Sequence, residues 1–187
     1  MPAGCRCLED VAARLLVEAG AVLRGRFRLS SGRESDIYID ARRLIGDSRA
    51  FPAMLGLLAA HARHLAVGAH AVVGVATGGI PWAVGLALLL GLPAGYVRLE
   101  AKGHGTQGSL EGWRGRGPVI LVDDVATTGG SLARAAAILR SHGAEPMSAV
   151  VIVDREEGAA ERLAEHDIVL EPLTTLSAVR KALGEPA

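Results

Sequence analysis

The sequence predicts an α/β fold with a mostly parallel, doubly wound sheet and helices on both of its faces. Three observations predict this fold. Short apolar segments alternate with helical patterns from residue 71 onward, as in parallel strands joined by crossover helices. Gly and Pro residues divide the apolar segments into pieces of strand length. Half of the residues are hydrophobic but only 3% are aromatic, so the core must consist mainly of Ala, Val and Leu.

The first third of the chain precedes this alternation. Apolar residues at helical spacing predict an opening helix, and a Ser-Ser-Gly turn separates two extended segments. Asp47 or Ser48 can cap a second helix. In order, these elements are expected over residues 8–19, 21–29, 36–40 and about 48–65.

The remaining two thirds repeat the pattern of strand, turn and helix. The expected strands are residues 71–75, 94–98, 119–123, 147–154 and about 168–170. The expected helices run from about 81 to 90, over 130–142, over a short segment after 158, and from about 175 onward. Residues 103–117 are rich in glycine and lack periodicity, so we expect a long functional loop there.

Charge and hydropathy exclude two classes of protein. Lys and Arg number 20 and Asp and Glu number 20, for zero net charge, which argues against a nucleic-acid-binding protein. Residues 71–97 carry no charge and could span a bilayer by length. Their glycines and prolines interrupt a continuous lipid-facing helix, so we reject the membrane interpretation. Residues 1–9 have no signal-peptide pattern, and a cytoplasmic location is expected.

The most informative segment covers residues 119–131. An apolar strand leads into two acids, and Thr-Thr-Gly-Gly-Ser then opens a helix. Glycines allow backbone N–H groups to surround an anion, hydroxyls add donors, and the helix dipole favours negative charge. The segment lacks the Lys-Ser/Thr ending of a nucleoside-triphosphate P-loop. It predicts a phosphate-binding turn.

Asp123 and Asp124 extend this interpretation. Beside a phosphate two carboxylates are repulsive, so they are expected to contact ribose hydroxyls, a metal ion or developing positive charge. Phosphate and diol binding together predict a site for a ribose 5-phosphate. The plain alternative is a strand-to-helix turn with two solvated acids.

Residues 122–131 resemble the phosphoribosyl-pyrophosphate signature of type I phosphoribosyltransferases. Four other segments resemble the orotate phosphoribosyltransferase family, in the family's order: residues 27–40, 75–81, 98–105 and 154–158. The signature alone indicates a phosphoribosyltransferase, whereas the combination indicates this family.

The resemblance implies the type I phosphoribosyltransferase fold in a single domain over residues 1–187. About residues 1–45 and the C-terminal end would form a small hood. It further implies transfer of the 5-phosphoribosyl group from phosphoribosyl pyrophosphate to orotate, giving orotidine 5′-monophosphate and pyrophosphate in pyrimidine synthesis. The implied cofactor is Mg²⁺, bound mainly through pyrophosphate and water. The implied partner is a second copy of the chain, in a homodimer whose segment 98–116 completes the neighbouring site.

The resemblance also assigns roles to individual residues. Catalytic roles fall to Lys102, His104, Asp123 and Asp124. Orotate is contacted by Thr127 and Arg155, whose guanidinium fork suits a carboxylate; an ion pair with Glu156 or Glu157 is the alternative for Arg155. Phosphoribosyl pyrophosphate is contacted by Arg98, Lys102, His104, Asp123, Asp124, Val125, Ala126, Thr127, Thr128, Gly129, Gly130 and Ser131.

Three positions depart from the family pattern. Many members have a second loop lysine where this chain has Leu99, and some have lysine in place of Ser30 or Gly78. Two other functions remain open on these residues. One is a phosphoribosyltransferase for a purine or other base, which would have no carboxylate for Arg155 to bind. The other is a non-catalytic sensor of phosphoribosyl pyrophosphate, which only Leu99 favours.

Overall fold

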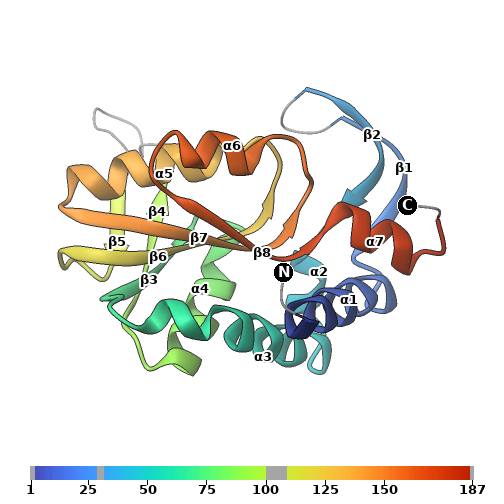
Figure 1. Cartoon of the computed structure of the whole chain (residues 1–187), viewed down its shortest axis with the longest axis horizontal. Coiled ribbons are helices and arrows are strands. Elements are labelled where there is room, and N and C mark those ends of the chain that lie inside the picture. The colour runs from blue at the N-terminus through green and yellow to red at the C-terminus, as the bar shows by residue number, and fades with distance from the viewer. Residues whose placement is uncertain (1–2, 29–31, 100–108, 186–187) are drawn as a thin grey trace.

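A six-stranded sheet covered by helices on both faces forms the centre of the molecule (Figure 1). The computed structural model describes residues 3–28, 32–99 and 109–185. The sheet order is β5-β4-β3-β6-β7-β8, and its neighbours are parallel except that β5 is antiparallel to β4. The predicted doubly wound, mostly parallel sheet is confirmed. Its strands are β3 (Ala71–Val75), β4 (Ala94–Arg98), β5 (Ser109–Gly112), β6 (Gly117–Ala126), β7 (Ala144–Asp154) and β8 (Val169–Thr175).

Helices divide between the two faces of this sheet, with α5 and α6 on one face and α3 and α4 on the other (Figure 1). Along β6, Val119 and Leu121 join the core beneath α5, whereas Ile120 and Val122 join the core beneath α4. This alternation buries both faces of a strand that reads as one apolar run. The helices are α1 (Ala3–Glu18), α2 (Arg42–Ile45), α3 (Ala50–Ala62), the 3-10 turn η1 (Arg63–Ala66), α4 (Gly79–Leu90), α5 (Gly130–Ser141), α6 (Ala159–Ala164) and α7 (Leu176–Ala182).

A separate antiparallel hairpin lies at one end of the sheet, beside α7 (Figure 1). Its strands are β1 (Val22–Arg28) and β2 (Glu34–Ile39). Asp36 of β2 accepts two hydrogen bonds from Arg180 of α7, at 2.6 and 3.2 Å. These bonds join the N-terminal hairpin to the C-terminal helix at the carboxyl edge of the sheet.

Most predicted elements are present, and several bounds differ. Strands β3 and β4 have the predicted bounds. The first helix begins at Ala3 rather than at residue 8, so the N-terminal segment is helical. Asp47 accepts the N–H groups of Arg49 and Ala50 at the start of α3, as expected of a capping residue. Helix α2 was not predicted, because a single turn leaves no periodicity to detect.

One prediction needs correction, because residues 103–117 are not a loop throughout. Residues 109–112 form β5, which pairs with the exposed edge of β4 and buries Leu110. This strand contains one buried apolar residue, so its sequence carries little strand signal. Among the described helices, none is long and apolar enough to cross a membrane. The uncharged stretch 71–97 is divided into β3, α4 and β4.

Candidate active site

Two adjacent carboxylates lie near the carboxyl end of β6, the edge at which open α/β sheets bind ligands. Asp123 is buried, and its Oδ1 accepts the N–H of Asp124 at 2.9 Å. Asp124 is half-buried, and its Oδ1 accepts the N–H of Val125 at 2.9 Å. Burial raises the pKa of Asp123 well above its ordinary value, and the neighbouring charge of Asp124 raises it further. The structure therefore pairs a buried acid that resists ionisation with a more accessible one.

The turn over residues 127–131 closes a cavity of about 220 Å³ at the N-terminus of α5. Gly129 has φ +73°, and a Cβ there would lie 3.1 Å from the carbonyl oxygen of Ala159 on α6. Glycine is therefore required by both backbone conformation and space. Thr127, Thr128 and Ser131 line the same cavity. Hydroxyl donors and the free N–H groups of a helix start suit a phosphate.

Two arginines missed by the sequence interpretation also line this cavity: Arg134 of α5 and Arg162 of α6. A Cβ built on Gly130 would lie 3.0 Å from Nη1 of Arg162, so this guanidinium sits close to the start of α5. A single arginine on an amphipathic helix is usually predicted to lie on the solvent-exposed face, so neither residue was assigned to the site. One signal was available, since Arg134 lies four residues after Gly130 and therefore on the same helix face.

A larger cavity of about 680 Å³ adjoins the first. Its walls come from β1 and β2, the turn at Thr77 and Gly78, the end of β6, and Arg155. Val125 and Thr127 line both cavities. The predicted phosphate-binding turn and the predicted orotate-binding arginine thus line two adjoining cavities, together called the cleft, with Asp124 in the wall of the larger one.

Arg155 follows β7, and its backbone N–H donates to the carbonyl of Ala126 at 2.9 Å. Its side chain is only 4% exposed and pairs with Glu157, with 2.8 Å between Nε and Oε1. The ion pair foreseen as an alternative is present. Arg155 nevertheless lines the cleft, so pairing with Glu157 and facing a ligand are compatible.

The other predicted cations have different outcomes. Arg98 ends β4, and its guanidinium lies 5.3 Å from the centre of the Tyr96 ring. The carbonyl of Val97 accepts the N–H of Ala76 at 2.8 Å. This bond places Arg98, the next residue of β4, beside the turn at Thr77. Lys102 and His104 lie outside the described residues.

Among the described residues, no group of three or more His, Cys, Asp or Glu side chains is placed to hold a metal ion. Asp124 still offers a carboxylate oxygen at the cleft, and oxygen donors are those that Mg²⁺ prefers. This donor set fits a Mg²⁺ ion bound mainly by substrate oxygens and water, with Asp124 accepting from its water shell.

Gly78 is in close contact with this acid. A Cβ at position 78 would lie 2.5 Å from Oδ2 and 2.7 Å from Oδ1 of Asp124. Any side chain at this position must therefore displace the carboxylate. The glycine found here keeps Asp124 in its observed place.

Gly78→Ala is expected to lower kcat/KM by about 10–100-fold, because a displacement of about 1 Å in a reacting site has an effect of this size. The free energy of unfolding should change by less than about 1 kcal/mol, since the side chain that must move is half-buried. Gly56→Ala is a matched control, because Gly56 is exposed in α3 with open space around it. Equal kcat/KM in both variants would contradict the placement of Asp124.

Comparisons with known proteins agree with this geometry. Residues 56–179 match the model of the phosphoribosyl transferase domain family. The orotate phosphoribosyltransferase of Aeropyrum pernix is 50% identical over 95% of both chains. The chain belongs to the orotate phosphoribosyltransferase family. The orotate phosphoribosyltransferase of Pyrococcus abyssi is 38% identical over 95% of this chain and 98% of its own.

Solved structures of orotate phosphoribosyltransferases share the fold. The crystal structure of the Aeropyrum pernix enzyme has a TM-score of 0.85 at 51% identity and covers 92% of this chain and 97% of its own. An orotate phosphoribosyltransferase from Mycobacterium tuberculosis, solved in complex with 5-phospho-α-D-ribosyl 1-diphosphate, has a TM-score of 0.69 at 27% identity. It covers 92% of this chain and 98% of its own.

Leu99, like Gly78, is a departure from the orotate phosphoribosyltransferase pattern that the structure explains. Its side chain is half-buried and packs against the core beneath α5, together with Trp113. A lysine there would have to leave this apolar contact to reach a ligand. Leu99 therefore serves packing in this chain.

Proposed function

We propose that the chain transfers the 5-phosphoribosyl group from phosphoribosyl pyrophosphate to orotate, giving orotidine 5′-monophosphate and pyrophosphate. The observation that carries this proposal is the cleft formed by the two adjoining cavities. A phosphate-binding turn at one end and a buried arginine at the other are joined through Thr127. Family membership supports the same substrates.

The 5-phosphate would occupy the cavity at the start of α5. Backbone N–H groups of residues 127–131 and the hydroxyls of Thr127, Thr128 and Ser131 would donate to it, aided by the helix dipole. Val125 and Ala126 would contact it as part of the cavity wall. Asp123 and Asp124 would accept the ribose hydroxyls. Their carboxyl groups would also lie near C1 as positive charge develops there, because glycosyl transfer passes through an oxocarbenium-like state.

Orotate would bind in the larger cavity, with its carboxylate on Arg155 and its ring near Thr127. Both residues line this cavity. A guanidinium N–H would form a charge-assisted hydrogen bond to this carboxylate, which would orient the ring as well as match its charge. The ring nitrogen would then be held in line with C1.

The leaving pyrophosphate would be met by Arg98, Lys102 and His104, with Lys102 and His104 as catalytic residues. Bound Mg²⁺ would neutralise part of the charge on the pyrophosphate. We further propose a cytoplasmic homodimer in which segment 98–116 completes the neighbouring site. One domain over residues 1–187 is proposed, with about residues 1–45 and the C-terminal end as a hood; the ion pair between Asp36 of β2 and Arg180 of α7 supports this grouping.

Arg162→Ala is expected to raise KM for phosphoribosyl pyrophosphate by about tenfold, the effect of losing one charge-assisted hydrogen bond to phosphate. The KM for orotate should change less than about twofold, because Arg162 lines only the smaller of the two cavities described. Initial rates with each substrate varied in turn measure both constants. Arg14→Ala, which removes an exposed arginine from α1, is the control. An unchanged KM for phosphoribosyl pyrophosphate in Arg162→Ala would remove this residue from the phosphate site.

A panel of bases tests the proposal against its two alternatives. The protein is mixed with phosphoribosyl pyrophosphate, Mg²⁺ and either orotate, adenine, guanine or hypoxanthine, and nucleotide formation is followed by chromatography. Of the four bases, we expect only orotate to give a nucleotide product. Product with a purine would favour the purine enzyme, and tight binding of phosphoribosyl pyrophosphate without any product would favour the sensor.

A further inference from the structure

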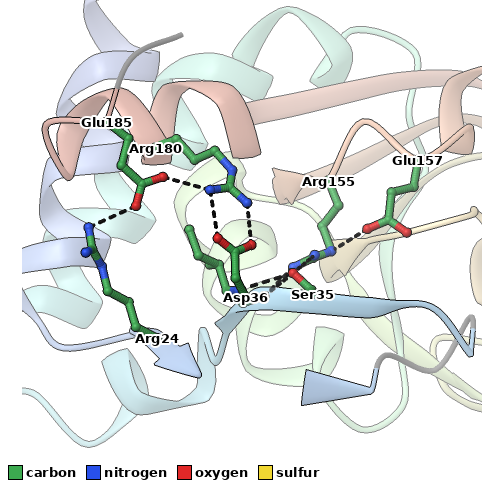
Figure 2. Close-up of polar contacts among 8 residues, drawn as sticks. Arg24, Ser35, Asp36, Arg155, Glu157, Arg180 and Glu185 are labelled. Carbon is green, nitrogen blue, oxygen red and sulfur yellow. Dashed lines mark hydrogen bonds and ion pairs between the residues drawn. The ribbon is translucent and has the colours of Figure 1, made fainter. Parts of the chain in front are cut away.

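The guanidinium of Arg155 is held by three protein contacts (Figure 2). Nε donates to Oε1 of Glu157 at 2.8 Å, Nη2 donates to Oγ of Ser35 at 3.0 Å, and Nη1 donates to the carbonyl of Ile37 at 3.3 Å. An arginine side chain has five N–H donors. One N–H therefore remains on each terminal nitrogen. The acceptors on Nη1 and Nη2 lie only 2.8 Å apart, so they occupy the edge that these two nitrogens share, and the remaining N–H groups point away from each other. A ligand carboxylate can accept one of them as a charge-assisted hydrogen bond.

Glu157 holds Arg155 from outside the proposed substrate cleft. Its side chain is 14% exposed and lines a separate cavity of about 420 Å³. Arg155 lines both that cavity and the larger cleft. Within the described part of the chain, Oε2 of Glu157 is buried without a hydrogen-bond partner.

Ser35 ties the same arginine to the hairpin. Its hydroxyl donates to the carbonyl of Ile37 at 2.8 Å and accepts the N–H of Ile37 at 3.2 Å. The hydroxyl and this carbonyl are the two groups of β2 that accept from Arg155. The turn at Ser35 thus places the Ser35 hydroxyl and the Ile37 carbonyl next to each other. These two acceptors bind the terminal nitrogens of Arg155, and Glu157 binds its Nε.

The hairpin strand is itself anchored to the C-terminal helix, as Figure 2 shows. Asp36, next to Ser35, pairs with Arg180 at 2.6 Å. Arg180 also pairs with Glu185 at 2.7 Å, and Glu185 pairs with Arg24 of β1 at 2.9 Å. Both strands of the hairpin are therefore linked to α7 and to the residues that follow it.

From these contacts we propose that Glu157 and Ser35 are positioning residues that set the direction of the Arg155 guanidinium toward the carboxylate of the pyrimidine substrate. The inference rests on the proposed function. Glu157 fixes Nε and Ser35 fixes Nη2, and together they hold the guanidinium in the orientation in which it lines the larger cavity with an N–H left for a ligand carboxylate. Neither residue contacts the phosphoribosyl end of the cleft, so their effect is confined to the base.

Glu157→Ala tests the proposal through a split between the two substrates. Loss of the charge-assisted bond to Nε should raise KM for orotate by about tenfold. The KM for phosphoribosyl pyrophosphate should stay within about twofold of the unchanged protein, because its site lies at the other end of the cleft. Glu157→Gln keeps an oxygen that can accept from Nε, and it should recover most of the loss. Ser35→Ala should raise KM for orotate in the same selective way.

Glu156→Gln is the matched control, because this substitution removes a carboxylate charge one residue away from Glu157. Its carboxylate accepts from the N–H and hydroxyl of Ser177 rather than from Arg155. The KM for orotate should not change in this variant. Equal rises for both substrates in Glu157→Ala, an unchanged KM for orotate, or a Glu157→Gln protein no better than Glu157→Ala would each overturn the proposal. Absence of turnover in the unchanged protein would instead contradict the proposed function.

Discussion

Arg155→Ala is expected to lower kcat/KM for orotate by about 10²–10³-fold. The buried guanidinium would supply a charge-assisted hydrogen bond to the carboxylate, and truncating one partner of such a pair costs about 2–5 kcal/mol. The KM for phosphoribosyl pyrophosphate should change little. Initial rates with each substrate varied in turn measure this difference.

Arg155→Lys separates charge from geometry in the same experiment. Lysine keeps the positive charge beside Glu157 but presents a single ammonium in place of a planar fork. We expect a loss between that of alanine and the unchanged protein. Thermal unfolding of both variants shows whether the loss of the ion pair alters folding, since alanine leaves Glu157 without its partner. An unchanged kcat/KM for orotate in Arg155→Ala would mean that the carboxylate binds elsewhere.

Asp123→Asn is expected to stabilise the ligand-free protein while lowering kcat by about 10²-fold or more. Burial and the charge of Asp124 raise the pKa of Asp123 well above the ordinary value of 3.8. The folded protein therefore binds a proton more tightly than the unfolded chain, and this group's contribution to stability falls as pH rises from 3.8 through the raised pKa. Asparagine has no charge to bury and can still accept the N–H of Asp124.

The pH dependence provides the check on this second prediction. Denaturant unfolding from about pH 4 to about pH 8 should show the variant gaining over the unchanged protein as pH rises, with the smallest difference at the acid end. The loss of kcat follows because a neutral amide stabilises developing positive charge poorly. A variant that is less stable at every pH would contradict the account of a destabilising buried carboxylate.

The parallel strands and the main site could be predicted because their signals are local. Residues 71–75 and 119–122 are apolar runs, and the two aspartates with the following glycines form one continuous motif. Strand β5 escaped prediction because only Leu110 is buried in it and its partner β4 lies across a long segment. Site residues that are brought together by tertiary packing also escaped prediction, because their partners are distant in sequence.

Arg162 and the contacts of Arg155 with the hairpin illustrate this limit. Arg162 reaches the phosphate cavity only because α6 packs beside the start of α5. Glu157 could be foreseen as a partner of Arg155, since it lies two residues away. The contacts of Arg155 with Ser35 and Ile37 join residues 120 and 118 positions apart, and no sequence spacing indicates them.

The most direct test of the central claim is the stoichiometry of one reaction. The unchanged protein is mixed with orotate, phosphoribosyl pyrophosphate and Mg²⁺, and orotate loss and pyrophosphate release are followed together. The proposed cleft predicts that both proceed at equal rates and that pyrophosphate release stops when orotate is omitted. Pyrophosphate release that does not depend on orotate, or no consumption of orotate at all, would contradict it.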